Sequence, residues 1–223
     1  MGTFQMAISI ILCLVIGYCF GCISTAYFVG KLYNIDIRKE GSGNLGSTNA
    51  LRTLGIKAGI MTFVGDIAKS FLPILVVRYI IFSNNTELGI VMALWLGLGT
   101  VLGHNFPFWL HFKGGKGIAA TAGLILAFHP YFIPAGVILF FGAFLTTHYV
   151  SLGSLLVYAG LMIQMVVCGQ MGLFHAPQAI LNEMYILTAL LTALAYYKHR
   201  ENIVRLVKGQ ERKTYLTKKK KGD

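Results

Sequence analysis

Three segments of the sequence combine glycines with side chains that bind anions. The first runs from Glu40 to Arg52 and holds three glycines within six positions. Such glycines let the backbone turn tightly and present its N–H groups, while Arg52 adds a guanidinium that binds phosphate through two hydrogen bonds. This pattern fits a phosphate site and an ordinary loop between helices about equally well. The candidate ligands are Gly41, Ser42, Gly43, Asn44, Gly46, Thr48, Asn49 and Arg52.

The second segment joins residues 103–107 to a lysine- and glycine-rich stretch, residues 112–117. An apolar run begins near Ile118, so the N–H groups of a helix N-terminus would lie beside the lysine ammoniums. Positive charge flanking two membrane spans would explain the lysines alone. It does not explain the glycines, and we therefore favour an anion site. The candidates are His104, Asn105, Lys113, Gly114, Gly115, Lys116 and Gly117.

The third segment covers residues 199–211. His199, Asn202 and Arg205 recur at three-residue spacing, which places them near one another on a helix, and apolar residues fall on one helical face. An amphipathic helix at the membrane surface explains most of this pattern. It does not explain Asn202 or Glu211, so His199, Asn202 and Glu211 become candidate site residues.

No set of residues suggests covalent catalysis or a metal. The sequence holds no Gly-x-Ser-x-Gly elbow, no histidine with an aspartate five positions later, and no histidine spacing typical of zinc sites. The four cysteines are interpreted as small apolar residues without a disulfide framework. We expect no metal and no cofactor.

Composition indicates which elements must position these segments. Only 12% of the 223 residues are charged and 56% are hydrophobic, whereas soluble domains carry about a quarter charged residues. The net charge is +11. In so apolar a chain, this charge favours an anionic membrane surface or an anionic substrate, and no nucleic acid is expected.

Seven apolar segments predict an all-α integral membrane protein, a bundle of seven transmembrane helices. A span needs about 20 apolar residues, so the twelve-residue fourth segment is too short to cross alone at full thickness. Residues 148–154 are polar and contain a glycine, and they are expected to form a loop. The N-terminus lacks the basic cluster of a signal peptide, which indicates a retained helix. The predicted spans are residues 4–30, 56–82, 87–110, 118–129, 131–147, 155–174 and 183–197.

The positive charges predict the orientation of the bundle. With the N-terminus outside and the C-terminus in the cytoplasm, all 19 Lys and Arg residues except Lys69 and Arg78 fall on the cytoplasmic side. All three glycine-rich or basic segments then share that face. Asp66 and Lys69 lie three apart in the second span; a structural salt bridge is the favoured interpretation, and a contribution to the site is the alternative.

Together, the three segments resemble motifs of the bacterial acyl-phosphate:glycerol-3-phosphate acyltransferase family. The first is similar to Ser-Gly-Asn-x-Gly-Ala-Thr-Asn-x-x-Arg, with Ser47 in place of the usual alanine. The second is similar to Gly-His-x-Phe-Pro followed by Phe-Lys-Gly-Gly-Lys-Gly, and residues 199–211 match the third throughout. The resemblance implies an acyltransferase domain over residues 1–211, with glycine-rich cytoplasmic loops 34–55 and 111–117 and the motif tail 198–211. Residues 212–223 then form a basic tail, whose lysine run at 218–221 is expected to touch anionic lipid.

The resemblance also implies the reaction. An acyl group moves from acyl phosphate to the 1-hydroxyl of glycerol 3-phosphate, giving lysophosphatidic acid and phosphate at the cytoplasmic face of the bacterial inner membrane. The first loop, with Arg52 as a bidentate clamp, is expected to bind one phosphate. Lys113, Lys116 and their glycines are expected to bind the other phosphate or the developing oxyanion. Asn202 and Glu211, supported by His199, would orient the glycerol.

Two other functions remain compatible with the residues alone. Basic, glycine-rich loops in a membrane bundle also suit a transporter for an organic phosphate, although transporters bind substrate near the midplane and the sequence has no convincing internal repeat. A scaffold that assembles lipid enzymes predicts neither acyl transfer nor phosphate binding.

Overall fold

The computed structural model describes residues 3–215, and this part of the chain contains ten α-helices and no strand. Five helical segments are long and apolar enough to cross a membrane, and α6 and α7 are shorter apolar helices. The prediction of an all-helical membrane protein is therefore confirmed. The helices are α1 (Thr3–Gly21), α2 (Thr25–Leu32), α3 (Ser47–Leu54), α4 (Ile56–Val76), α5 (Thr86–Asn105), α6 (Ile118–Phe128), α7 (Phe132–Thr147), α8 (Val150–Gln170), α9 (Gln178–Lys198) and α10 (Arg200–Val207).

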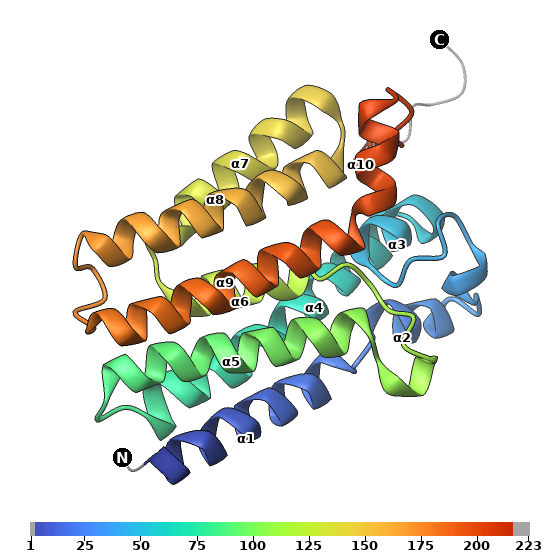
Figure 1. Ribbon diagram of the computed structural model, residues 1–223. Coiled ribbons are helices and arrows are strands. Elements are labelled where there is room, and N and C mark those ends of the chain that lie inside the picture. Colours follow the sequence, from blue (N-terminus) through green and yellow to red (C-terminus); the bar gives the residue numbers. More distant parts are fainter. Residues whose placement is uncertain (1–2, 216–223) are drawn as a thin grey trace, which may run out of the picture.

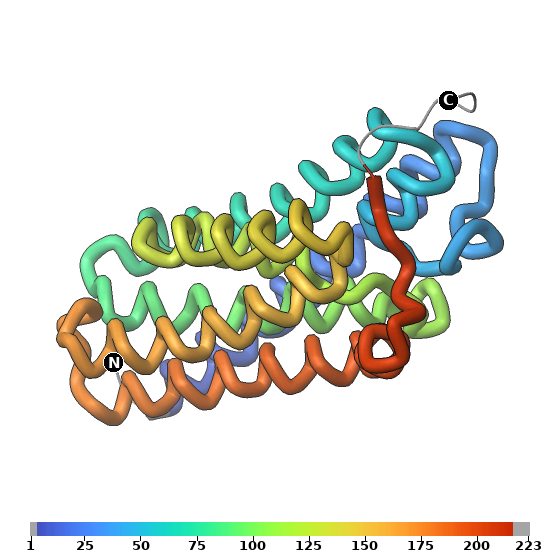
Figure 2. Tube along the Cα trace, turned by 90° about the horizontal axis from the view of Figure 1, so that it is seen from above, coloured from blue at the N-terminus to red at the C-terminus, as the bar shows by residue number. Residues whose placement is uncertain are grey.

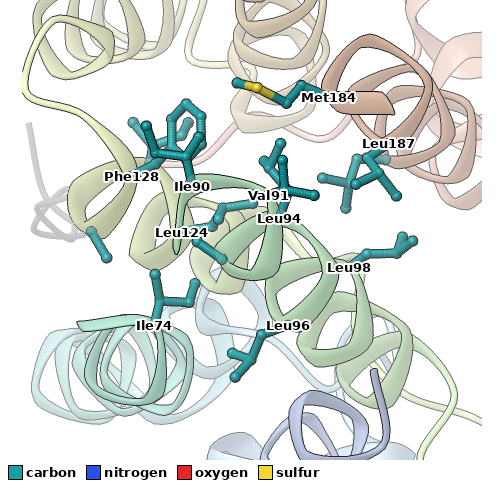
Figure 3. Packing of buried hydrophobic residues seen from close by; sticks show 14 of the residues in the cluster. Ile74, Ile90, Val91, Leu94, Leu96, Leu98, Leu124, Phe128, Met184 and Leu187 are labelled. Atoms are coloured by element: carbon teal, nitrogen blue, oxygen red, sulfur yellow. The ribbon is translucent and has the colours of Figure 1, made fainter. Parts of the chain in front are cut away.

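Helix α5 lies at the centre of the bundle and packs against α1, α4, α6 and α9 (Figure 1). Its buried residues form the core together with apolar side chains of α4, α6 and α9 (Figure 3). The contact with α1 is close: a Cβ added at Gly17 would lie 2.2 Å from the Leu96 carbonyl oxygen, and one at Gly103 would lie 2.1 Å from that of Tyr18. Small residues allow helix backbones to approach in this way inside membranes.

Large apolar side chains cover the outside of the bundle. Ile11 of α1, Val64 of α4 and Ile138 of α7 are all more than half exposed. A soluble monomer rarely exposes such extended apolar surfaces. These outer faces are therefore suited to contact with lipid chains.

The predicted first span, residues 4–30, agrees with the candidate span Phe4–Leu32, and its helix is broken between α1 and α2. Two side chains from other elements bind carbonyl groups at the break. Trp109 Nε1 donates to the Cys22 carbonyl at 2.8 Å, and Lys69 Nζ donates to the Ile23 carbonyl at 2.8 Å. These bonds satisfy backbone acceptors that a continuous helix would satisfy internally.

The predicted sixth span is displaced along the sequence, because α8 covers Val150–Gln170 rather than residues 155–174. The stretch 148–154 was expected to be a loop because it is polar. Within α8, however, the Ser154 hydroxyl donates to the Val150 carbonyl one turn earlier at 2.8 Å. A serine that bonds to its own helix is compatible with an apolar surrounding.

Helix α6 ends after only 11 residues, at the buried Phe128. Arg78 lies in the π-helical segment η2 (Val77–Ile81) that follows α4, and its Nη1 donates to the carbonyls of Ala127 (2.8 Å) and Phe128. Arg78 thus satisfies two carbonyls that the end of α6 leaves without helical partners. This contact gives a structural reason for a cation within a predicted span.

The glycine-rich and basic segments gather at the end of the bundle opposite the start of α1 (Figure 1). Here α10 turns away from the direction of α9, α3 lies near α10, and α2 packs against α3 and α4. The lysine run predicted to touch lipid, residues 218–221, lies outside the described residues. The end of the bundle with α3 and α10 therefore contains all three candidate segments.

Candidate phosphate-binding and catalytic site

A pocket of about 420 Å³ lies at this end of the bundle. All three candidate segments contribute to it, together with the first turns of α6 and α8. It is lined by Gly41, Ser42, Gly43, Asn44, Gly46, Ser47, Thr48, Asn49, Arg52, Asp66, His104, Gly114, Lys116, Gly117, Ile118, Ala119, Val150, Ser151, Ser154, His199, Glu201, Asn202, Arg205, Glu211 and Arg212.

Two helix N-termini open into this pocket. Helix α3 begins after Gly46 and α6 begins after Gly117, and neither has a side-chain cap. The first N–H groups of a helix have no intrahelical partners and carry the positive end of the helix dipole. Uncapped N-termini therefore provide anion sites. Gly117 has a φ of +88°, which an L side chain rarely adopts, so glycine is favoured at the start of α6.

The loop before α6 lies flat against the end of α5. The N–H groups of Gly114 and Gly115 donate to the carbonyls of Asn105 (3.2 Å) and His104 (3.0 Å). A Cβ added at Gly115 would lie 2.0 Å from His104 Nε2, so a larger residue would displace the loop or the imidazole. Position 115 therefore requires glycine for packing, independently of any phosphate binding.

Asn49 organises the first segment. Its Oδ1 accepts the Ser42 N–H at 2.9 Å, and its Nδ2 donates to the Glu40 carbonyl at 3.1 Å. The side chain is only 2% exposed. Asn49 was expected to bind phosphate; its amide shapes the loop that leads into α3, and the residue also lines the pocket.

A chain of hydrogen bonds links the second segment to the third. Lys116 Nζ donates to Asn202 Oδ1, and Asn202 Nδ2 donates to Glu211 Oε1 at 2.9 Å. The other carboxylate oxygen of Glu211 accepts Arg205 Nε at 2.9 Å. Glu211 is thereby a buried carboxylate held by an amide and a cation, and the chain fixes Lys116 at the mouth of α6.

The pKa values of two site residues are lowered by their surroundings. Burial, assisted by the nearby positive charge of Arg205, lowers the pKa of Lys116 to about 8. Burial lowers the pKa of His199 to about 4, so this imidazole is neutral at pH 7. His199 Nδ1 lies 2.8 Å from the Ala195 carbonyl, which only accepts hydrogen bonds. Nδ1 therefore carries the proton, and Nε2 keeps a lone pair that can accept one.

Asp66, Lys69 and His104 form a buried polar cluster beneath the pocket. Lys69 Nζ lies 2.7 Å from Asp66 Oδ1 and 2.9 Å from His104 Nδ1. The predicted pairing of Asp66 with Lys69 is confirmed. Asp66 and His104 also line the pocket. The cluster of Asp66, Lys69 and His104 therefore contributes both to the packing of the bundle and to the floor of the site.

Several predicted site residues lie away from the pocket wall. Lys113 is exposed, Asn105 is fully buried, and Gly115 packs on His104; none of the three lines the pocket. The remaining candidates are brought together as expected. Ser151 and Ser154 were not predicted as site residues, because they were placed in a loop rather than in the first two turns of α8.

Two arginines of the site also lay outside the candidate set. The spacing of Arg205 from Asn202 was a usable signal, because three residues place both side chains on one helical face. Arg212 lies one residue beyond the last motif, and no sequence pattern indicates that it lines the pocket.

Comparison with known proteins identifies the family. A family model described as glycerol-3-phosphate acyltransferase matches residues 11–209. "Glycerol-3-phosphate acyltransferase 2" of Bacillus cereus is 37% identical over 214 residues, covering 93% of this chain and 96% of the relative. The glycerol-3-phosphate acyltransferase of Macrococcus caseolyticus is 40% identical over 210 residues, covering 94% and 99%.

Two crystal structures of PlsY (YgiH), an integral membrane glycerol 3-phosphate acyltransferase, share the fold. The glycerol 3-phosphate form matches with a TM-score of 0.79, and the lysophosphatidic acid form with a TM-score of 0.77. Both are 32% identical to this chain and cover 93% of it, with 96% of their own length matched. Sequence and structure agree over nearly the whole length: this chain belongs to the glycerol-3-phosphate acyltransferase family.

Proposed function

We propose that this protein transfers a fatty acyl group from acyl phosphate to the 1-hydroxyl of sn-glycerol 3-phosphate. The products are 1-acyl-sn-glycerol 3-phosphate and inorganic phosphate, and the reaction begins phospholipid synthesis. The family supports the acyltransferase activity and glycerol 3-phosphate as a substrate. One observation carries the proposal further: two uncapped helix N-termini and the basic side chains of Arg52 and Lys116 line one pocket.

Each substrate contributes one phosphate, and the pocket offers two places for them. The N-terminus of α3 with Arg52 forms one, and the N-terminus of α6 with Lys116 forms the other. Backbone N–H groups and cations held in advance stabilise negative charge without reorganising during the reaction. This arrangement suits a reaction in which two anionic substrates must be brought together and charge develops between them.

The chemical step needs no covalent enzyme intermediate. The 1-oxygen of glycerol 3-phosphate forms a bond to the acyl carbon, and the bond from that carbon to the phosphate oxygen breaks, with its electron pair leaving on phosphate. The departing phosphate accepts the hydroxyl proton. Phosphate is a good leaving group in a mixed anhydride, so positioning and electrostatic stabilisation supply the catalysis.

The third segment orients these groups. His199 Nε2 has a lone pair and can accept a hydrogen bond from a glycerol hydroxyl. Asn202 and Glu211 were expected to contact glycerol as well. Their bonds to Lys116 and Arg205 favour a different role, in which they hold the Lys116 ammonium at the mouth of α6.

The membrane arrangement that we propose has seven crossings, with α6 and α7 as the two short ones. The N-terminus lies outside, and the pocket faces the cytoplasm of a bacterial cell. The distribution of Lys and Arg supports this orientation, because the pocket end carries the basic segments. A soluble glycerol 3-phosphate then meets an acyl chain held in the bilayer.

Purified protein in detergent tests the proposal. With a synthetic acyl phosphate and radiolabelled glycerol 3-phosphate, we expect labelled lysophosphatidic acid and an equal amount of phosphate. Flux of glycerol 3-phosphate into liposomes without any labelled lipid would instead indicate a transporter. If neither labelled lipid nor flux is detected, only a scaffold function remains and the proposal is overturned.

A further inference from the structure

The chain after Glu211 contacts the rim of the pocket. After α10 the described residues run across the end of the bundle toward the segment that holds α3 (Figure 2). Arg212 Nη1 donates to the Gly41 carbonyl at 3.3 Å, and Arg212 also lines the pocket. These contacts cross the domain boundary predicted after Glu211 and join residues 212–215 to the site.

Thr214 holds the guanidinium of Arg52. Arg52 Nε donates to Thr214 Oγ1 at 3.0 Å, and Nη2 donates to the same oxygen. Nη2 also donates to the Arg212 carbonyl at 2.8 Å. In the described part of the chain, no carboxylate forms an ion pair with Arg52. Two neutral oxygens therefore fix one edge of the guanidinium, and the Nη1 group takes no part in these bonds.

Thr214 is itself held firmly. Its side chain is almost completely buried, at 1% exposure, and its N–H donates to the His148 carbonyl at 2.9 Å. The ring of the next residue, Tyr215, lies 4.7 Å from the His148 ring. His148 is one of the two residues between α7 and α8, so Thr214 connects this turn of the bundle to Arg52.

We infer that Thr214 is a positioning residue, which holds Arg52 ready to bind a substrate phosphate. The inference rests on the proposed role of Arg52. A free arginine side chain loses much rotamer freedom when it binds, and an anchored guanidinium has lost that freedom beforehand. A neutral anchor also leaves the full positive charge available to phosphate, whereas a carboxylate anchor would compete for it.

The test compares Thr214→Val, which removes the hydroxyl at nearly constant size, with Thr214→Ser, which keeps it. For Thr214→Val we expect KM for the substrate that Arg52 binds to rise about tenfold, the usual effect of losing a hydrogen bond to a charged group. Thr214→Ser should behave like the wild type. The matched control is Thr188→Val, which removes a buried hydroxyl that bonds only to its own helix, at the Met184 carbonyl.

The same substitution in an Arg52→Ala background separates positioning from general stability. If Thr214 acts through Arg52, Thr214→Val adds no further loss there; a merely structural role would lower activity equally in both backgrounds. If Thr214→Val does not fold, Thr214→Ala removes the same hydroxyl without adding bulk. Wild-type KM values in Thr214→Val or Thr214→Ala, beside an impaired Arg52→Ala, would overturn this inference alone. Wild-type kinetics of Arg52→Ala would instead refute the Arg52 clamp and the inference together.

Discussion

The charge state of Lys116 gives a direct prediction for the pH dependence of the reaction. Its pKa is lowered to about 8, first by burial and then by Arg205, while Glu211 acts in the opposite direction. Only the protonated ammonium stabilises a phosphate or an oxyanion. Deprotonation as the pH rises through about 8 removes that charge, so kcat/KM should fall on the alkaline side.

The size of this fall follows from the pKa. With a pKa of about 8, Lys116 is roughly nine-tenths protonated at pH 7 and about one-tenth protonated at pH 9. We therefore expect kcat/KM for glycerol 3-phosphate to fall about tenfold between pH 7 and pH 9. The quantity kcat/KM reports the ionisation of the free enzyme, which is the state in which Lys116 has this pKa.

The assay measures lysophosphatidic acid formed by purified protein between pH 6 and pH 9.5, corrected for spontaneous hydrolysis of acyl phosphate. Lys116→Arg is the matched variant, because a guanidinium stays charged throughout this range. Its absolute rate is expected to be lower, and its alkaline decline should be absent. An alkaline decline of the same size in Lys116→Arg, or a flat profile in the wild type, would show that the ionisation of Lys116 does not control the reaction.

Three further substitutions test the parts that support the site. Gly115→Ala places a Cβ 2.0 Å from His104 Nε2, so kcat should fall about 10²-fold through displacement of the loop, and the unfolding temperature should fall with it. Asn49→Asp keeps the acceptor for the Ser42 N–H and loses the donor to the Glu40 carbonyl. KM for a phosphate substrate should therefore rise about tenfold. An unchanged KM in steady-state kinetics would contradict the role of Asn49 in shaping the loop. Arg78→Leu leaves two carbonyls at the end of α6 without this partner and should destabilise the protein by about 1–3 kcal/mol, seen as a lower unfolding temperature in detergent, with turnover retained at low temperature.

Apolar runs predicted most of the fold because a membrane helix must be both long and apolar. The boundaries failed where side chains from distant residues bind the backbone. The first helix breaks at residues 22–24, where Trp109 binds the Cys22 carbonyl, and this contact cannot be read from the local sequence. The fourth span, predicted as residues 118–129, agrees with α6 (Ile118–Phe128). The start of α8 was missed because polarity was taken to indicate a loop, whereas Ser154 bonds within its own helix.

The three motifs predicted which segments meet at the site, and the structure refines what their members do. Glycines and cations mark anion sites by their chemistry, and this signal is local. The hydrogen bonds of Asn202 and Glu211 depend on the turn between α9 and α10 and on the course of the chain after α10. Thr214 lies beyond the motifs, and its contact with Arg52 joins residues 162 positions apart. Contacts of this kind require the three-dimensional structure.

The turnover of Arg52→Ala and Lys116→Ala at saturating substrate tests whether acyl transfer occurs in this pocket. If the pocket between α3, α6 and α10 is where acyl transfer occurs, each substitution removes a cation that stabilises a phosphate or the developing charge. We predict that each lowers turnover by about 10²–10³-fold, with the protein still folded by thermal unfolding in detergent. Near wild-type turnover in both variants would contradict the assignment of this pocket as the site of acyl transfer.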